Sequence, residues 1–119
     1  MSYYAGLCLR GLNRNNEAIA TLEPLSREKS DYGTLAQVVL ADVYERSGNL
    51  SRATETYQKM VEDGSPIAPK NASLMHLAEL YEQQNKKNEA AKIYQQVVKD
   101  FPGTPFFAEA EQKIKQLSQ

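Results

Sequence analysis

The sequence is poor in the residues that build reactive or metal-binding sites. Its 119 residues include one cysteine, one histidine and no tryptophan. A lone cysteine, Cys8, cannot form a disulfide within the chain and leaves the redox compartment open; we interpret it as a small packed residue of the first helix. The lone histidine, His76, has no second histidine or cysteine at a metal-ligand spacing. The sequence therefore predicts no metal site, and we interpret His76 as a partly exposed structural residue.

The sequence also gives little support for phosphate binding or for catalysis by a pair of carboxylates. The six glycines are scattered and form no phosphate-binding loop. Glu79 and Glu82 lie three residues apart, a spacing that a solvated helix face explains more simply than a catalytic carboxylate pair. We therefore predict no catalytic site and no cofactor, and an enzyme is the least expected class of protein.

The charge balance and the hydropathy disfavour nucleic acid and membrane partners. Fourteen Lys and Arg against 15 Asp and Glu leave a net charge of -1, without the basic field that neutralises phosphates. No apolar run approaches the length of a bilayer span, and no signal peptide is visible. With 41% hydrophobic residues, we expect one soluble domain without membrane contact within this chain.

The sequence does contain the pattern of a helical hairpin over residues 71–104. Small, aromatic and leucine residues recur at three- and four-residue steps, which places them on one face of each of two helices. These residues are Leu74, Leu77, Ala78 and Tyr81 in the first helix, and Ala90 and Tyr94 in the second. A polar connection joins the two helices, and Pro102 ends the second. Because a large side chain would push the helix axes apart, Ala78 and Ala90 mark the predicted crossing point.

The same offsets recur 37 residues earlier, where Gln37 stands in the place of Leu74. The matching residues are Leu40, Ala41, Tyr44, Ala53 and Tyr57. A weaker copy at the beginning of the chain contains Ala5, Gly6, Leu9, Ala18 and Leu22. Three copies in register indicate an internal repeat.

This spacing resembles the tetratricopeptide repeat, with Leu74 where that family often has tryptophan. The resemblance implies an all-α, right-handed superhelix of antiparallel helical hairpins, a TPR-like α-solenoid of about seven helices. The chain would divide into a partial first repeat (1–33), a second repeat (34–70), a third repeat (71–104) and a C-terminal capping helix (105–119). The incomplete first repeat predicts that the chain is a piece of a longer protein.

Capping residues and prolines set the expected helix limits. Helices are expected over residues 2–12, 16–29, 32–47, 49–63, 72–84 and 88–100 and from Pro105 onward, with caps at Ser30, Asp31 and Asn49 and a stop at Gly48. Pro24 predicts a kink in the second helix. The last helix is expected to carry an apolar stripe of Phe107, Ala110, Ile114 and Leu117.

The resemblance implies a non-catalytic scaffold that binds a partner peptide or helix through its concave face. On that face we predict a groove with an apolar strip and an acidic flank. Its residues are Tyr3, Leu7, Arg10, Val38, Asp42, Glu45, Met75, Glu79 and Glu82. Such a groove favours a partner with basic and apolar residues over a carboxylate terminus.

A structural role stays open as the alternative. The chain would then stack on further repeats or self-associate, with no ligand in the groove. Tyr3, Tyr4 and Leu7 would leave an apolar patch at the N-terminal end, which predicts a homodimer. Residues 94–105 are similar in style to bacterial cell-envelope members of the family, which would suit the periplasmic part of an envelope-anchored protein. The sequence names neither the compartment nor the partner.

Overall fold

Six helices make up the part of the chain that the structure describes, residues 14–118 of a computed structural model. They are α2 (Asn15–Ser26), α3 (Asp31–Arg46), α4 (Leu50–Asp63), α5 (Lys70–Gln83), α6 (Lys87–Asp100) and α7 (Pro105–Leu117). No strand occurs between residues 14 and 118. The helix expected over residues 2–12, with Cys8, lies outside the described residues.

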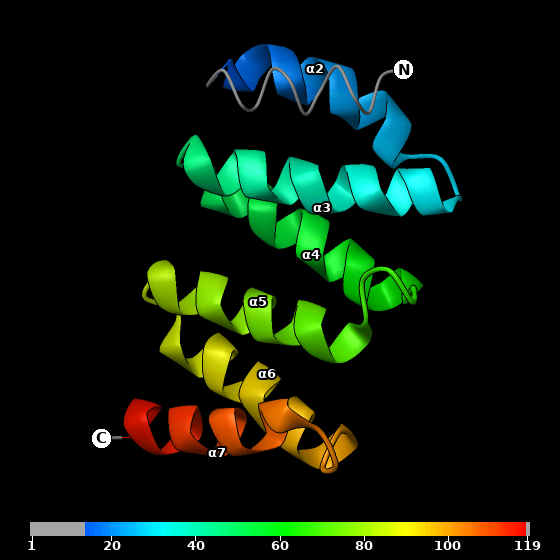
Figure 1. The fold of residues 1–119 in the computed structure, drawn as a ribbon. Helices are drawn as coiled ribbons and strands as arrows, with labels where there is room; N and C mark the ends of the chain where they lie inside the picture. The colour runs from blue at the N-terminus through cyan, green and yellow to red at the C-terminus, as the bar shows by residue number, and fades with distance from the viewer. Residues whose placement is uncertain (1–13, 119) are drawn as a thin grey trace.

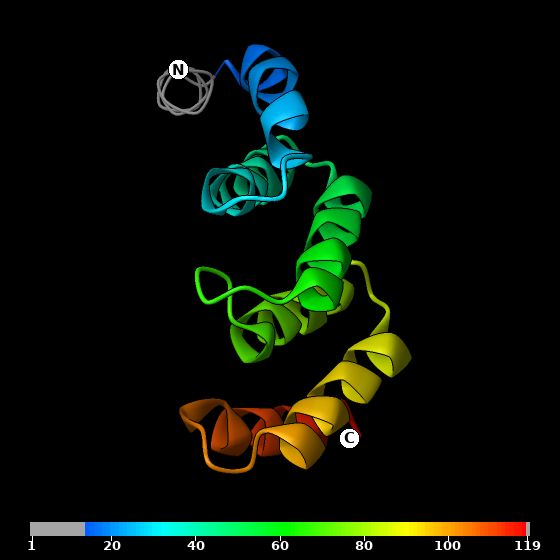
Figure 2. The same ribbon diagram turned by 90° about the vertical axis from the view of Figure 1, so that its right-hand side faces the viewer.

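The helices stack in chain order (Figure 1), and each one contacts the next. Seen from the side, α3, α5 and α7 form one layer, and α4 and α6 form the other (Figure 2). Contact between consecutive helices is the arrangement that a series of short hairpins produces. The predicted all-α solenoid of antiparallel helical hairpins is confirmed.

Helix limits follow the predicted capping residues. The backbone N–H of Gly33 donates to Ser30 Oγ at 3.1 Å at the beginning of α3. The N–H of Arg52 likewise donates to Asn49 Oδ1 at 3.2 Å at the beginning of α4. After α3, Gly48 has a φ of 83°, which a residue without a Cβ adopts at little cost. The caps at Ser30 and Asn49 and the stop at Gly48 are confirmed. The expected cap at Asp31 was wrong, because Asp31 is the first residue of α3 itself.

Pro24 lies inside α2, two residues before the helix ends at Ser26. The sequence analysis predicted that this helix would continue to Lys29. The ribbon of α2 bends toward α3 over its last turns (Figure 1). A proline has no N–H to donate and crowds the preceding turn, so a bend and an early end are expected near it.

Alanines occupy the helix crossings, as predicted. Ala41, Ala53, Ala78 and Ala90 are each 0% exposed. Ala78 and Ala90 share one cluster of buried residues with Tyr94, whose ring fills the space beside them. Small residues at these positions let the helix backbones approach closely.

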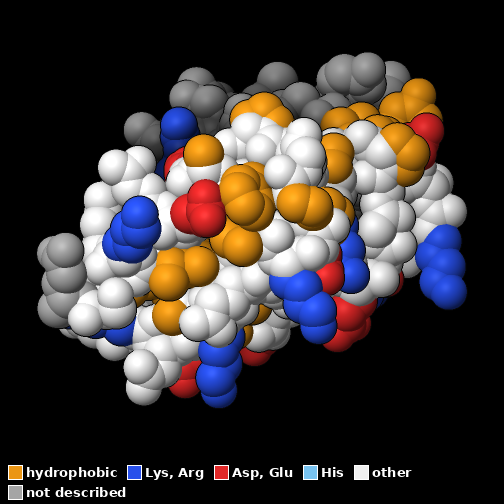
Figure 3. All heavy atoms as spheres, turned by 90° about the horizontal axis from the view of Figure 1, so that it is seen from below, with side chains coloured by type: hydrophobic (Ala, Val, Ile, Leu, Met, Phe, Trp, Pro, Cys, Tyr) orange, Lys and Arg blue, Asp and Glu red, His pale blue; other side chains and the backbone are white. Residues whose placement is uncertain are grey.

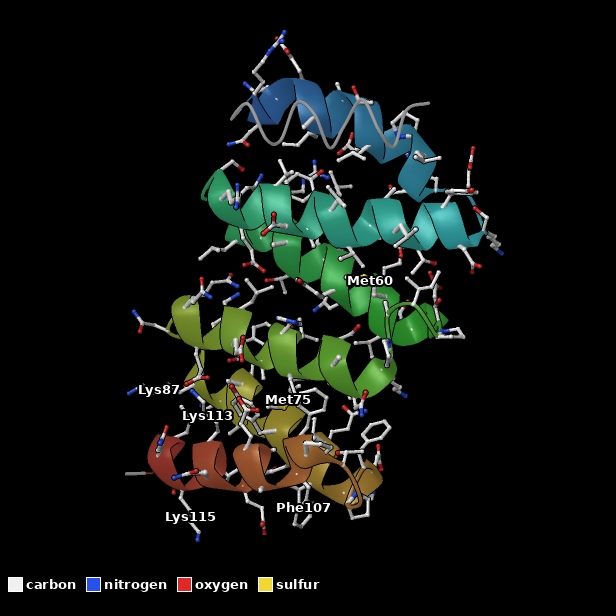
Figure 4. The ribbon with its side chains drawn as sticks, viewed as in Figure 1. Met60, Met75, Lys87, Phe107, Lys113 and Lys115 are labelled. Carbon is white, nitrogen blue, oxygen red and sulfur yellow. The ribbon has the colours of Figure 1, made fainter. Side chains whose placement is uncertain are left out.

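The apolar stripe of α7 differs from the prediction at one position. Ala110 is buried, and Ile114 and Leu117 pack against the same cluster as Tyr94. The phenylalanine that packs there is Phe106, whereas Phe107 points away from α5 (Figure 4). Phe106 and Phe107 lie four and three residues before Ala110, and either spacing fits one helix face. Because Phe106 is the one that packs against the cluster, the assignment of Phe107 was wrong.

Gly33 lies where the beginning of α3 passes the end of α2. A Cβ added at Gly33 would lie 1.9 Å from the backbone oxygen of Glu28. Because that atom belongs to the backbone, the two segments would have to move apart. We expect Gly33→Ala to lower the free energy of unfolding by about 1 to 2 kcal/mol, measured by urea denaturation.

Gly103→Ala is the matched control for this prediction. An added Cβ there meets no atom within 4 Å, and we expect a change below about 0.5 kcal/mol. Equal destabilisation by the two substitutions would contradict the close approach at Gly33.

Candidate functional site

Three carboxylates converge on the face that α3 and α5 share. Asp42 and Glu45 come from α3, and Glu79 comes from α5. Burial raises the pKa of Glu45 from its ordinary value, and the negative charges of Asp42 and Glu79 act in the same direction. Charges influence one another in this way only when they lie close together. We call Asp42, Glu45 and Glu79 the acidic patch.

An aromatic ring from the second layer lies beneath the acidic patch. Tyr57 of α4 is 8% exposed. Burial raises its pKa to about 12, and the carboxylates of Glu45, Asp42 and Glu79 add to the shift. All three members of the patch therefore lie within electrostatic reach of this one phenol.

His76 covers the Tyr57 ring. The two rings stack with centroids 5.4 Å apart and planes 20° from parallel. The Nδ1 atom of His76 lies 3.8 Å from Glu79 Oε2, and its side chain is 57% exposed. The sequence analysis assigned His76 no part in any site. The three-residue spacing between His76 and Glu79 indicated in the sequence that these two side chains are neighbours. The sequence did not indicate the contact with Tyr57, because Tyr57 lies 19 residues away in the chain.

The edge of the acidic patch is partly apolar and partly basic. Val38, one turn before Asp42 on α3, is 37% exposed. The Nε atom of Arg46 lies 3.5 Å from Asp42 Oδ2, within ion-pair distance. A ligand on this face would meet an exposed methyl surface next to negative charge.

The structure places Met75 in the core. This residue was predicted to line the groove, but it is 3% exposed and packs in the cluster that contains Tyr94. In Figure 4, Met75 lies between α5 and α7. Because α7 packs across α5, it covers the part of the face that would otherwise continue the groove.

Glu82 is engaged within the C-terminal half. The Tyr94 hydroxyl donates to Glu82 Oε2 at 2.6 Å, and Lys113 Nζ lies 3.7 Å from the same oxygen. Burial, followed by this hydrogen bond, raises the pKa of Tyr94 and keeps the phenol protonated as a donor. Glu82 thus links three helices, α5, α6 and α7.

The structure brings together only part of the predicted groove. Val38, Asp42, Glu45 and Glu79 lie along α3 and α5 as described. Tyr3, Leu7 and Arg10 lie outside the described residues. His76 and Tyr57 are the two residues that the sequence analysis left out of the site.

This face presents carboxylates, a stacked ring pair and an exposed valine. Between residues 14 and 118, no group of three or more His, Cys, Asp or Glu side chains is arranged to hold a metal ion. Within the same range, every helix falls short of the length and apolar character that crossing a bilayer requires. Carboxylates beside a stacked ring pair can attract a basic side chain and provide a surface for its aliphatic part.

Two tetratricopeptide-repeat family models match the sequence, one over residues 3–72 and the other over residues 72–104. The longer match covers more than half of the chain. The chain belongs to the tetratricopeptide repeat family. A comparison with curated proteins gives no match. TPR domains generally mediate protein–protein interactions and are generally non-catalytic scaffolds. The two matches of this TPR chain meet at residue 72, in the first turn of α5.

Proposed function

We propose that this TPR domain is a non-catalytic scaffold that binds a partner peptide or helix on the face between α3 and α5. The observation that supports the proposal is the acidic patch next to the stacked rings of Tyr57 and His76. Glu45 keeps a carboxylate in a partly buried position, where its pKa is raised. A retained, partly desolvated carboxylate costs stability, and a basic partner would offset that cost.

The partner should combine basic and apolar side chains. Lys or Arg would meet the acidic patch, while an apolar residue would contact Val38 and the exposed edge of the His76 ring. A negatively charged segment would be repelled, because like charges placed together cost binding free energy. For the same reason we expect no nucleic-acid partner on this face.

The test is affinity capture from cell lysate with the domain as bait, quantified by mass spectrometry. We expect Asp42→Lys combined with Glu79→Lys to weaken retention of the partner roughly tenfold, because both changes replace attraction by repulsion. Retention by the parent domain should also fall as the salt concentration rises. Glu82 is left unchanged because it accepts the hydrogen bond from Tyr94.

The control carries the same change of net charge elsewhere. Glu89 in α6 and Glu111 in α7 are exposed, so Glu89→Lys with Glu111→Lys alters total charge without touching the acidic patch. This control should retain the partner. If both double variants lose the partner equally, total charge alone decides binding and the acidic patch has no specific role.

A second candidate function is stacking of a further repeat, or of a second copy, on the end formed by α7. Hydrophobic side chains gather at this end of the stack (Figure 3), and Phe107 and Lys115 point outward from α7 (Figure 4). Sedimentation velocity distinguishes the two functions. Self-association lost in Phe107→Lys, with capture of the partner unchanged, would assign that association to the α7 end.

For localisation we propose the periplasm, as part of an envelope-anchored protein. The support is the similarity of residues 94–105 to bacterial cell-envelope members of the family. Fractionation of a bacterial source, with the full-length protein detected by antibody, tests this location. Recovery in the cytosolic fraction would contradict it.

A further inference from the structure

The ring of His76 has one covered face and one open face. Its covered face stacks on the ring of Tyr57, with the centroids 5.4 Å apart and the planes 20° from parallel. Tyr57 is 8% exposed, so this second ring belongs to the core of the stack. The His76 side chain is nevertheless 57% exposed. Its exposed area therefore belongs to the ring edge and to the face opposite Tyr57, which we call the outer face of His76.

Two carboxylates lie beside this ring. The Oε2 atom of Glu79 lies 3.8 Å from His76 Nδ1. Burial raises the pKa of Glu45, and a positive charge on His76 acts in the opposite direction, so these two side chains lie within electrostatic reach of each other. Between residues 14 and 118, no Lys or Arg nitrogen lies within 4.0 Å of the Glu45 or Glu79 carboxylate. The outer face of His76 is thus a flat surface with two hydrogen-bond acceptors next to it.

A guanidinium group fits this arrangement better than an ammonium group does. The guanidinium group is planar and weakly hydrated, so it stacks on aromatic rings while its edge donates hydrogen bonds. Stacked on the outer face of His76, it would donate to the carboxylates beside the ring, and such charge-assisted hydrogen bonds are strong. An ammonium group is a compact, strongly hydrated charge that gains no stacking contact. The ring together with the carboxylates therefore favours arginine over lysine.

We propose that the outer face of His76 receives an arginine side chain of the partner, with Glu45 and Glu79 as its hydrogen-bond acceptors. The inference rests on the proposed function, because it names the residue of the partner that the face between α3 and α5 recognises. Charge complementarity supports this occupant, since the groups beside the ring are negative. Val38, which is 37% exposed on the same face, would contact an apolar residue of the same partner.

His76 should make this recognition depend on pH. An imidazole ring gains a proton as the pH falls from about 8 to about 5, and the protonated ring would repel a guanidinium group stacked on it. The groups around the ring pair are Asp42, Glu45 and, paired with Asp42, Arg46 from α3, the neutral phenol of Tyr57 from α4, and Glu79 on α5. Because the carboxylates attract both cations, arginine and the proton on His76 compete. By linkage, arginine binding should displace that proton.

The test is an NMR titration of the ¹⁵N-labelled domain, prepared without a histidine tag, with two peptides of equal charge. Each peptide has blocked ends and one basic residue between alanines, which is arginine in the first and lysine in the second. The reporters are the backbone amide of Glu79 and the imidazole signal of His76, the one histidine of the chain. At about pH 7.5 we expect saturable binding of the arginine peptide with a dissociation constant of roughly 1 mM, and binding of the lysine peptide that is at least about fivefold weaker.

Variants of His76 separate stacking from protonation. In the parent domain, affinity for the arginine peptide should fall about threefold or more between about pH 7.5 and about pH 5.5, and the peptide should move the imidazole titration to lower pH. His76→Phe keeps a flat ring that cannot be protonated, so it should retain the preference for arginine and lose the pH dependence. His76→Ala removes the ring and should give the two peptides equal affinity.

Substitution of a carboxylate provides the matched control. Glu79→Gln should weaken binding of the arginine peptide about fivefold, because it removes a charged acceptor beside the ring. Glu89→Gln, at an exposed position of α6, makes the same change of net charge away from the ring and should leave binding unchanged.

Three results would overturn the proposal. Absence of a saturable shift with the arginine peptide would mean that the outer face of His76 binds no guanidinium group. Equal affinity of the parent domain for the two peptides would mean that charge alone is recognised, and the proposed basic partner would then stand without the ring. Full pH dependence in His76→Phe would assign the titration to another group. Lysate capture with the Asp42→Lys, Glu79→Lys variant tests the proposed function separately, because its outcome does not depend on which basic residue the partner contains.

Discussion

Tyr94→Ala is expected to lower the free energy of unfolding by about 3 to 5 kcal/mol. Tyr94 is 0% exposed and is among the largest fully buried side chains. Its ring lies in one cluster with residues of α5, α6 and α7. Removing the ring would leave a cavity at the point where these three helices meet, and the surrounding side chains can fill it only in part. Urea denaturation followed by circular dichroism measures the change.

One further variant divides the effect of Tyr94 into the contributions of its ring and its hydroxyl. Tyr94→Phe keeps the ring but removes the hydrogen bond to Glu82, and we expect it to cost about 1 to 2 kcal/mol. Tyr32→Ala is the exposed control, because Tyr32 is 61% exposed, with an expected change below about 0.5 kcal/mol. If Tyr94→Ala cost no more than Tyr32→Ala, Tyr94 would not be a core residue.

Ala90→Leu is expected to lower the free energy of unfolding by about 2 to 3 kcal/mol. Ala90 is 0% exposed, and so is Ala78 in the same cluster. A leucine adds three carbon atoms where α5 and α6 cross, and a close-packed crossing has no space for them. The helices would have to separate, or the new side chain would adopt an unfavourable rotamer. Ala78→Leu should have an effect of similar size for the same reason.

Ala108→Leu is the matched control for the overpacking variants. Ala108 lies on an exposed position of α7, where a leucine meets solvent and the helix retains a favourable residue. Its melting temperature should stay close to that of the parent domain. Indifference of the melting temperature to both Ala90→Leu and Ala78→Leu would contradict the crossing point and the repeat register.

The helices were predictable from the sequence because their causes are local. Apolar residues at three- and four-residue steps define a helix face. Two helices begin at the side-chain caps of Ser30 and Asn49, and one helix ends before Gly48, which has a positive φ. The remaining differences are small. For example, α5 begins at Lys70, directly after Pro69, instead of at Ala72.

The candidate site could be predicted only for those residues whose exposure follows from their position in the repeat. Asp42 and Glu79 occupy equivalent positions in two consecutive repeats, so their shared face followed from the sequence. Met75 and Glu82 occupy positions of the same kind, yet α7 covers Met75, and Glu82 binds Tyr94 and Lys113. A repeat pattern indicates which way a side chain faces within its hairpin. It contains no information on what a later helix will cover.

The sequence by itself determined that this protein is a stack of helical hairpins with alanine crossings, since spacing, caps and prolines act over a few residues. Tertiary structure alone decided that His76 stacks on Tyr57 and that Gln37 lines a cavity. The physical reason is that each of these features depends on the distance between two helix surfaces. That distance results from the packing of the whole stack, whereas periodicity along the chain specifies only the direction in which each residue points.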